Sequence, residues 1–381
     1  MKYELLRVRN GKVASVSFAE LLFDLIYVFA VTQISHYLLN HLTVNGFVES
    51  LVLWFAVWLA WQYTAWITNW FDPEARPVRL MLFVLMLLGL YVAAAIPSAF
   101  GERGLIFALF FVAIQVGRTC ATLFFIESSS PLRMNFLRIL GWLCISAAFW
   151  IAGGFNQGNA RLLFWFIAVL CEYISPMLGY HLPFLGRSKS ETDWTIEGHH
   201  LAERCQLFVI VALGETLLIT GSSLSRLAVW QPPTIIASIV SFIGCLAMWW
   251  IYFDKTSKAA SLAIRQSSNP GKMGAYFHYV HVALVGSIIV YAVGNELTIA
   301  HPDEHITRVT NAVLIFAPAL YLLSSSFFKK IVYGRFPASH IGGLLALLVL
   351  AVIANITDLL MVNTCVSVIL IYVAIWEVIT S

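Results

Sequence analysis

Long apolar runs separated by short polar stretches recur from residue 16 to residue 378 of the chain. Each run holds roughly 20 residues, enough for a helix to cross about 30 Å of membrane hydrocarbon. The stretches between them carry turn residues, as in Asp72-Pro73 and Asn269-Pro270-Gly271. The pattern predicts an all-α, polytopic bundle of about twelve transmembrane helices, over residues 16–40, 48–69, 79–99, 104–126, 134–154, 161–180, 200–222, 234–253, 276–298, 308–328, 339–356 and 358–378.

Composition agrees with a membrane protein. The 381 residues are 60% hydrophobic and only 11% charged, whereas soluble domains contain about 25% charged residues. The chain therefore lacks the polar surface that a soluble protein of this size needs. We expect no cleavable leader, because the first apolar run carries Glu20 and Asp24 and no small-residue cleavage site follows it.

The basic residues predict which side of the membrane each loop occupies. Most of the 23 Lys and Arg residues fall at the N-terminus and in the even-numbered loops, counted from the first span. The odd-numbered loops hold only Arg103, Arg161, Arg226 and Arg308. The positive-inside rule then places both termini and the even loops in the cytoplasm. We expect a multi-pass protein of the cell (inner or plasma) membrane.

The two halves of the chain resemble each other. Ala19-Glu20 in the first span matches Ala202-Glu203 in the seventh, and the second and eighth spans end in Phe71-Asp72 and Phe253-Asp254 at nearly the same offset. Six spans per half preserve orientation, which predicts two parallel six-helix repeats related by an axis along the membrane normal. The predicted domains are a first repeat at 1–182, a cytoplasmic linker at 183–199 and a second repeat at 200–381.

Ionisable residues inside the predicted spans are the candidate functional residues. A charged side chain at the bilayer centre costs about 2.5–3.5 kcal/mol on insertion scales, so such residues face the bundle interior and have partners. Glu20 and Asp24 lie four residues apart on one helix face. The full set of candidate pathway residues is Glu20, Asp24, Glu172, Glu203, Glu215, His278 and His281, with Arg118 and Arg204 as their charge-pairing partners.

Two interpretations of this set remain open. In the first, Arg118 and Arg204 neutralise neighbouring carboxylates and the network only holds the helices together. In the second, the acids and histidines line a water-filled vestibule that binds a cation or relays protons. We favour a pathway, because the acids outnumber the two buried arginines.

Other kinds of site have little support. The spacing of His278 and His281 would let both contact one metal ion, but no HExxH-type motif accompanies them, and we predict no metal site. The chain contains no P-loop, dinucleotide-binding glycine pattern, GxSxG or CxxC motif. We therefore predict no cofactor and no catalytic residues, and lean against an enzyme. The basic residues are dispersed as the positive-inside rule requires, so we expect no nucleic-acid binding.

Two motifs resemble a known family. The run Phe18–Ala30 with Thr32-Gln33, and His199-His200-Leu201-Ala202-Glu203-Arg204 followed by Leu213-Gly214-Glu215, are similar to the bacterial low temperature requirement protein A family. The resemblance covers nearly the whole chain. It implies a multi-spanning membrane protein tied to growth at low temperature, and it supplies no catalytic residues.

Phe23-Asp24 gives a looser similarity to the endolysosomal potassium channels built from two six-helix repeats, although Glu20 stands near the place of that family's arginine. The similarity implies that such an architecture can conduct cations. We expect the protein to move a cation, a proton or a small cationic solute. The alternative is an intramembrane enzyme acting on a lipid or isoprenoid substrate. We expect membrane lipids as partners, and we include a homodimer among the candidate assemblies.

Overall fold

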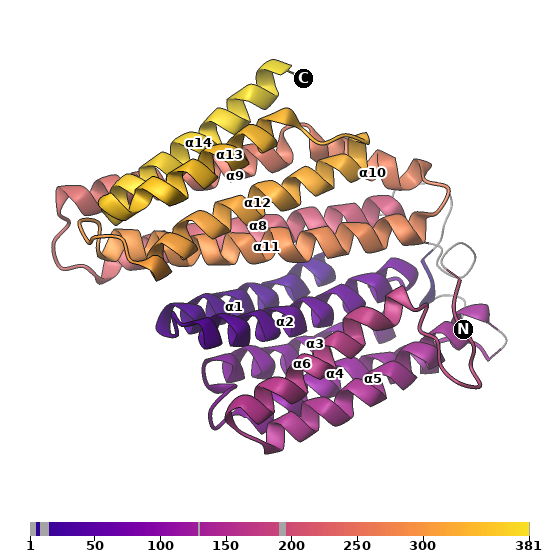
Figure 1. The fold of residues 1–381 in the computed structure, drawn as a ribbon. Coiled ribbons are helices and arrows are strands. Elements are labelled where there is room, and N and C mark those ends of the chain that lie inside the picture. The colour runs from indigo at the N-terminus through magenta and orange to yellow at the C-terminus, as the bar shows by residue number, and fades with distance from the viewer. Residues whose placement is uncertain (1–4, 8–14, 129, 190–195, 381) are drawn as a thin grey trace. The chain divides into compact units, whose positions relative to one another are not determined.

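The computed structural model describes residues 5–7, 15–128, 130–189 and 196–380, and is helical throughout these ranges apart from connecting turns (Figure 1). The helices are α1 (Phe18–Asn40), α2 (Val44–Trp70), α3 (Arg76–Ala95), α4 (Gly104–Phe125), α5 (Pro131–Phe155), α6 (Gly158–Met177), α8 (Gly198–Arg226), α9 (Pro232–Phe253), α10 (Thr256–Gln266), α11 (Pro270–Ala300), α12 (Arg308–Tyr333), α13 (Ala338–Ile353) and α14 (Leu359–Thr380), with short 3₁₀ turns at Ile96–Ser98 and Ala354–Ile356.

Twelve helices in the described residues are long and apolar enough to span a membrane, which confirms the predicted all-α bundle. Their ends fall within a few residues of the expected ones, with the largest extensions in α8 and α11. The agreement has a physical cause, because bilayer thickness sets a minimum length for every apolar helix. The exception is α10, which has 11 residues and lies where we expected only a loop.

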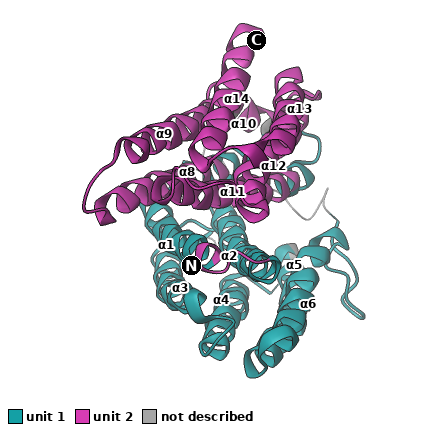
Figure 2. Cartoon of the chain, turned by 60° about the vertical axis from the view of Figure 1, so that its left-hand side comes forward, with its two compact units in different colours: residues 1–37, 44–204, 264–275 teal, residues 38–43, 205–263, 276–381 magenta. Residues whose placement is uncertain are grey.

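The chain divides into two compact units (Figure 2). Unit 1 comprises residues 1–37, 44–204 and 264–275, and unit 2 comprises residues 38–43, 205–263 and 276–381. Unit 1 thus holds α1 to α6 and the first turns of α8, and unit 2 holds most of the later helices. The internal repeat, its boundaries and the cytoplasmic placement of the termini stay predictions.

The helices of unit 1 pack in a sequential order, with α4 against α3 and α5, and α5 against α6. An aromatic cluster fills the space between them. The ring centroids of Phe111 and Trp150 lie 4.6 Å apart, and those of Phe107 and Trp165 lie 5.1 Å apart. Gly153 allows the close approach, since a Cβ atom there would clash with the Trp165 ring.

In unit 2, α14 packs against α9, α12 and α13. The hydroxyl of Tyr321 in α12 donates to the carbonyl of Met248 in α9 at 2.5 Å. These contacts join α9, α12, α13 and α14 within unit 2.

Candidate functional site

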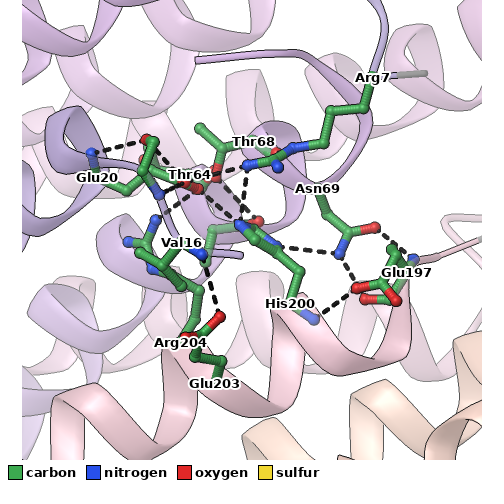
Figure 3. A network of polar contacts seen from close by, with 12 residues as sticks. Arg7, Val16, Glu20, Thr64, Thr68, Asn69, Glu197, His200, Glu203 and Arg204 are labelled. Carbon is green, nitrogen blue, oxygen red and sulfur yellow. Dashed lines mark hydrogen bonds and ion pairs between the residues drawn. The ribbon is translucent and has the colours of Figure 1, made fainter. Parts of the chain in front are cut away.

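A buried polar cluster lies in unit 1 where α2 ends and where α1 and α8 begin (Figure 3). Residues 5–7 also lie beside this cluster. Leu6 forms an isolated antiparallel bridge with Phe71, and the Arg7 amide donates a hydrogen bond to the Trp70 carbonyl at 2.9 Å. The Arg7 side chain then turns into the cluster, where its Nε donates to the Thr68 carbonyl at 2.7 Å.

Glu20 is the centre of the cluster and is fully buried. Its Oε2 accepts from the Ser17 amide and hydroxyl, both at 2.9 Å, and from Arg7 Nη2 at 3.1 Å. Its Oε1 accepts from His200 Nε2 at 2.8 Å and from Arg204 Nη1 at 2.9 Å. Five donors therefore saturate this carboxylate, and burial without them would be costly.

The protonation of His200 follows from its neighbours. Asn69 is oriented by the main chain, because its Oδ1 accepts from the Glu197 amide and its Nδ2 donates to the Glu197 carbonyl, both at 2.8 Å. The same Nδ2 lies 3.2 Å from His200 Nδ1, which must then be the acceptor. The proton of neutral His200 is on Nε2, the atom that donates to Glu20. In this tautomer His200 is an uncharged donor to Glu20, and Arg7 Nη2, which lies 3.1 Å from Nε2, directs its hydrogen bond to Glu20 and not to the ring.

Arg204 connects Glu20 with Asp24, and its side chain is fully buried. Its Nη2 lies 2.7 Å from Asp24 Oδ1, which also accepts from Trp61 Nε1 at 2.8 Å. The other oxygen of Asp24, Oδ2, is buried and has no hydrogen-bond donor among the described residues. Thus only one of the two carboxylate oxygens of Asp24 accepts hydrogen bonds from the described residues, whereas both oxygens of Glu20 do.

The charges of the buried cluster balance. The carboxylates of Glu20 and Asp24 face the guanidinium groups of Arg7 and Arg204. Arg7 was missed by sequence reasoning, which counted it only as a basic residue of the cytoplasmic N-terminus. The sequence therefore suggested a surplus of acid that this cluster does not have.

Glu203 and Glu197 lie at the edge of the cluster. The Glu203 side chain is 32% exposed, and its Oε2 accepts from the Val16 amide at 3.0 Å. Glu197 precedes α8 and accepts from the His200 amide at 2.6 Å, which caps the helix. Sequence reasoning assigned no chemistry to the loop that holds Glu197.

A second buried cluster joins α4, α5 and α6 in unit 1. Glu172 accepts from Ser146 and Trp150 on Oε1, both at 2.9 Å, and from Gln115 Nε2 on Oε2 at 2.6 Å. Gln115 in turn accepts from Arg118, which also donates to the Ala60 carbonyl at 3.0 Å. Arg118 and Glu172 are therefore linked by hydrogen bonds through the side-chain amide of Gln115, and they do not form a direct ion pair.

The remaining candidates lie in unit 2. Glu215 in α8 is 1% exposed, and His278 and His281 in α11 are fully buried. His281 Nδ1 lies 2.6 Å from the Phe277 carbonyl and so carries a proton, while Nε2 lies 2.6 Å from the Tyr252 hydroxyl and accepts from it. Both nitrogens of His281 are used in a neutral ring. In the described residues, no group of three His, Cys, Asp or Glu side chains could hold a metal ion.

Sequence reasoning also missed Trp61 and Asn69. Trp61 is an aromatic residue of an apolar span, yet its ring nitrogen donates a hydrogen bond to Asp24. The available signal was the polar run Thr64, Thr68 and Asn69 at the end of an otherwise apolar span, because such residues need partners at membrane depth.

The twelve apolar helices found among the described residues, together with the buried and paired ionisable groups within them, define a multi-pass integral membrane protein. The family model described as "Bacterial low temperature requirement A protein (LtrA)" matches residues 15–375. The chain belongs to this family. It is also similar to the uncharacterized protein RA0937 of Rhizobium meliloti (strain 1021), with 36% identity over 375 residues that cover 98% of this chain and 91% of the relative. No solved structure matches the chain.

Proposed function

We propose that the protein moves a proton or a small cation across the membrane, with Asp24 as the carboxylate that binds it. The observation that supports this proposal is the unpaired Oδ2 atom of Asp24, buried among the described residues of a membrane-spanning helix. A buried acceptor without a donor costs about 1–3 kcal/mol, and more when it is charged. A proton or cation arriving at Asp24 would relieve this cost.

The arrangement around Asp24 allows its charge to change without collapse of the cluster. Arg204 bonds both Asp24 and Glu20 through different nitrogens. When Asp24 is neutralised, Arg204 keeps its ion pair with Glu20, which it then shares with Arg7. Protonation of Asp24 therefore weakens one contact between α1 and α8 and leaves the other in place.

The same contacts give Glu20 and Glu172 a different role from Asp24. Every oxygen of both carboxylates accepts at least one hydrogen bond. A cation that bound there would have to displace donors that are already optimally close. We therefore propose that Glu20, with Arg7 and His200, holds α1, α2 and α8 together, and that Glu172 with Gln115 and Arg118 does so for α4 to α6.

The proposal is tested by ion flux into proteoliposomes that contain the purified full-length protein. A potassium, sodium or proton gradient is imposed and an internal dye reports proton or cation entry, with protein-free vesicles alongside. The Asp24→Asn variant keeps an oxygen that can accept from Trp61, and Glu49→Gln is the matched control. Glu49 is a buried carboxylate in unit 1 that bonds Tyr37 and Asn45 at 2.7 and 2.9 Å.

We expect flux above that of empty vesicles, loss of it in Asp24→Asn and retention of it in Glu49→Gln. Flux that persists in Asp24→Asn would remove Asp24 from the pathway. Absence of flux under all three gradients, with the protein correctly inserted, would overturn the transport proposal.

A further inference from the structure

A pocket of about 720 Å³ opens in unit 2 where several helix ends meet. Its walls come from the end of α9, the start of α10, the end of α12, the start of α13 and the end of α14. The positive-inside rule predicts that all of these ends face the cytoplasm. The pocket would then lie at the depth of the lipid headgroups on that side.

Three cations and two acids line the pocket. The cations are Lys255, Lys329 and Arg335, and the acids are Asp254 and Glu377. Lys329 forms an ion pair with Glu377 inside the wall, so these two charges cancel. The charge that remains is that of Lys255 and Arg335 against Asp254, a net charge of one positive unit.

Arg335 is presented to the pocket by a tight turn between α12 and α13. Gly334 ends α12 with a left-handed φ of 76°, and its amide donates to the Lys330 carbonyl at 2.8 Å. Pro337, three residues after Gly334, is the N-cap residue of α13. Glycine tolerates a positive φ, and the ring of Pro337 fixes the φ angle where the chain enters α13. Both residues therefore restrict the backbone around Arg335. Arg335 is exposed and forms no ion pair with any described residue.

Aromatic side chains complete the wall beside these charges. Tyr333 is 47% exposed, and Trp376 lines the pocket from α14 one residue before Glu377. Trp and Tyr concentrate at membrane interfaces, where an apolar ring meets the acyl boundary and a polar atom meets the headgroups. The pocket thus offers an apolar surface next to a guanidinium group.

We infer that this pocket binds the phosphate group of an anionic ligand, with Arg335 and Lys255 as the groups that contact it. Guanidinium and ammonium groups are the side chains that recognise phosphate oxygens, and basic pockets between transmembrane helices on the cytoplasmic side hold lipid headgroups. The volume suits a small ligand, because ligand pockets span about 300–1,000 Å³. The single net positive charge favours a phosphodiester over a polyphosphate.

Native mass spectrometry of the full-length protein in detergent tests this inference, because it counts bound ligand and does not depend on transport. The protein is titrated in separate arms with short-chain phosphatidylglycerol, with phosphatidylcholine and with glycerol 3-phosphate. The test variant is Arg335→Ala combined with Lys255→Ala; both side chains are exposed, so the fold is retained. The matched control is Arg76→Ala, an exposed arginine at the start of α3 that does not line the pocket.

We expect phosphatidylglycerol to bind more tightly than phosphatidylcholine, and the double variant to weaken its binding at least tenfold while Arg76→Ala leaves it unchanged. Binding of glycerol 3-phosphate that is lost in the same variant would identify a free phosphate ester as the source. Equal binding to wild type and double variant, or no binding in any arm, would overturn the inference and leave the flux proposal at Asp24 untouched.

Discussion

Arg204 Nη2 lies 2.7 Å from Asp24 Oδ1, so the first turns of α8 are joined to α1 by a fully buried ion pair. The same guanidinium group reaches Glu20 with its other nitrogen at 2.9 Å. A buried ion pair adds little net stability, because desolvation offsets its attraction, but breaking it leaves an uncompensated charge. This asymmetry determines how substitutions in the cluster should behave.

Replacing Arg204 by methionine should destabilise the protein strongly. In the Arg204→Met variant, Trp61 is the one donor that the described residues still provide to the buried Asp24 carboxylate. Loss of one partner of a buried pair costs about 3–5 kcal/mol. The measurement is the free energy of unfolding in mixed detergent micelles, followed by tryptophan fluorescence. The exposed Arg76→Ala variant should show no change.

The double variant Arg204→Met with Asp24→Asn should recover part of this loss. Glu20 retains Arg7 and His200 as donors there, and the charge at position 24 is gone. A double-mutant cycle gives the coupling between Arg204 and Asp24. If the two losses simply added, the two residues would not interact in the folded protein.

Flux should distinguish Asp24 from Glu172. We expect Asp24→Asn to abolish transport and Glu172→Gln to leave most of it, since both oxygens of Glu172 are already bonded to Ser146, Trp150 and Gln115. Both proteins are compared in proteoliposomes at equal density. Loss of flux in Glu172→Gln alone would place the pathway at α4 to α6 instead.

The sequence predicted the helices well and the site only partly. Each span is fixed locally by the length of its apolar run, so no knowledge of neighbours is needed. The partner of Glu20 depends on which segments meet in three dimensions. Nothing local to Arg7 marks it as a buried partner, and its role depends on the bridge between Leu6 and Phe71. Glu197 likewise lies in a predicted loop, and nothing in the sequence near it indicates that its main chain bonds Asn69.

The histidines show a second limit of sequence reasoning. Buried histidines in a span suggested a vestibule that binds a cation or relays protons, but a sequence does not give the hydrogen bonds of each ring nitrogen. His281 uses both nitrogens in a neutral ring, between Phe277 and Tyr252. These two hydrogen bonds join His281 to α9 and to its own helix, and its place in a pathway stays a prediction.

Asn69 should anchor the start of α8 to the end of α2. The Asn69→Ala variant loses two hydrogen bonds to the Glu197 main chain, which costs about 1–3 kcal/mol if the groups stay buried. Opening of this contact should make trypsin cleave faster after Arg187 and Lys189, as measured on gels. Asn156→Ala, which removes only a bond to the Ala152 carbonyl, is the control. Equal cleavage rates in both variants would show that the anchor is dispensable.

Tyr252→Phe should destabilise unit 2, because it removes the only donor that the described residues provide to His281 Nε2. A buried acceptor left without a donor costs about 1–3 kcal/mol. Thermal unfolding followed by tryptophan fluorescence provides the measurement, with Tyr372→Phe, an exposed tyrosine of α14, as the control. An unchanged transition in Tyr252→Phe would mean that this hydrogen bond contributes nothing to stability.

The predicted orientation can be tested at positions that carry no positive charge. Substitution there leaves unchanged the distribution of Lys and Arg from which the orientation is predicted. Glu102 and Glu304 lie in loops predicted to face outward, and Phe184 lies in a loop predicted to face the cytoplasm; all three are exposed. Single cysteines are introduced there after the six native cysteines are replaced, and intact cells are treated with a membrane-impermeant maleimide. Glu102→Cys and Glu304→Cys should react at once, and Phe184→Cys only after the cells are permeabilised, because the excess of Lys and Arg holds its loop inside.

The reverse labelling pattern would mean that the protein is inserted in the opposite orientation, and that the proposed phosphate-binding pocket faces outward. Reaction at Glu102 but not at Glu304 would mean that the two halves do not share one orientation, and it would end the case for a parallel repeat.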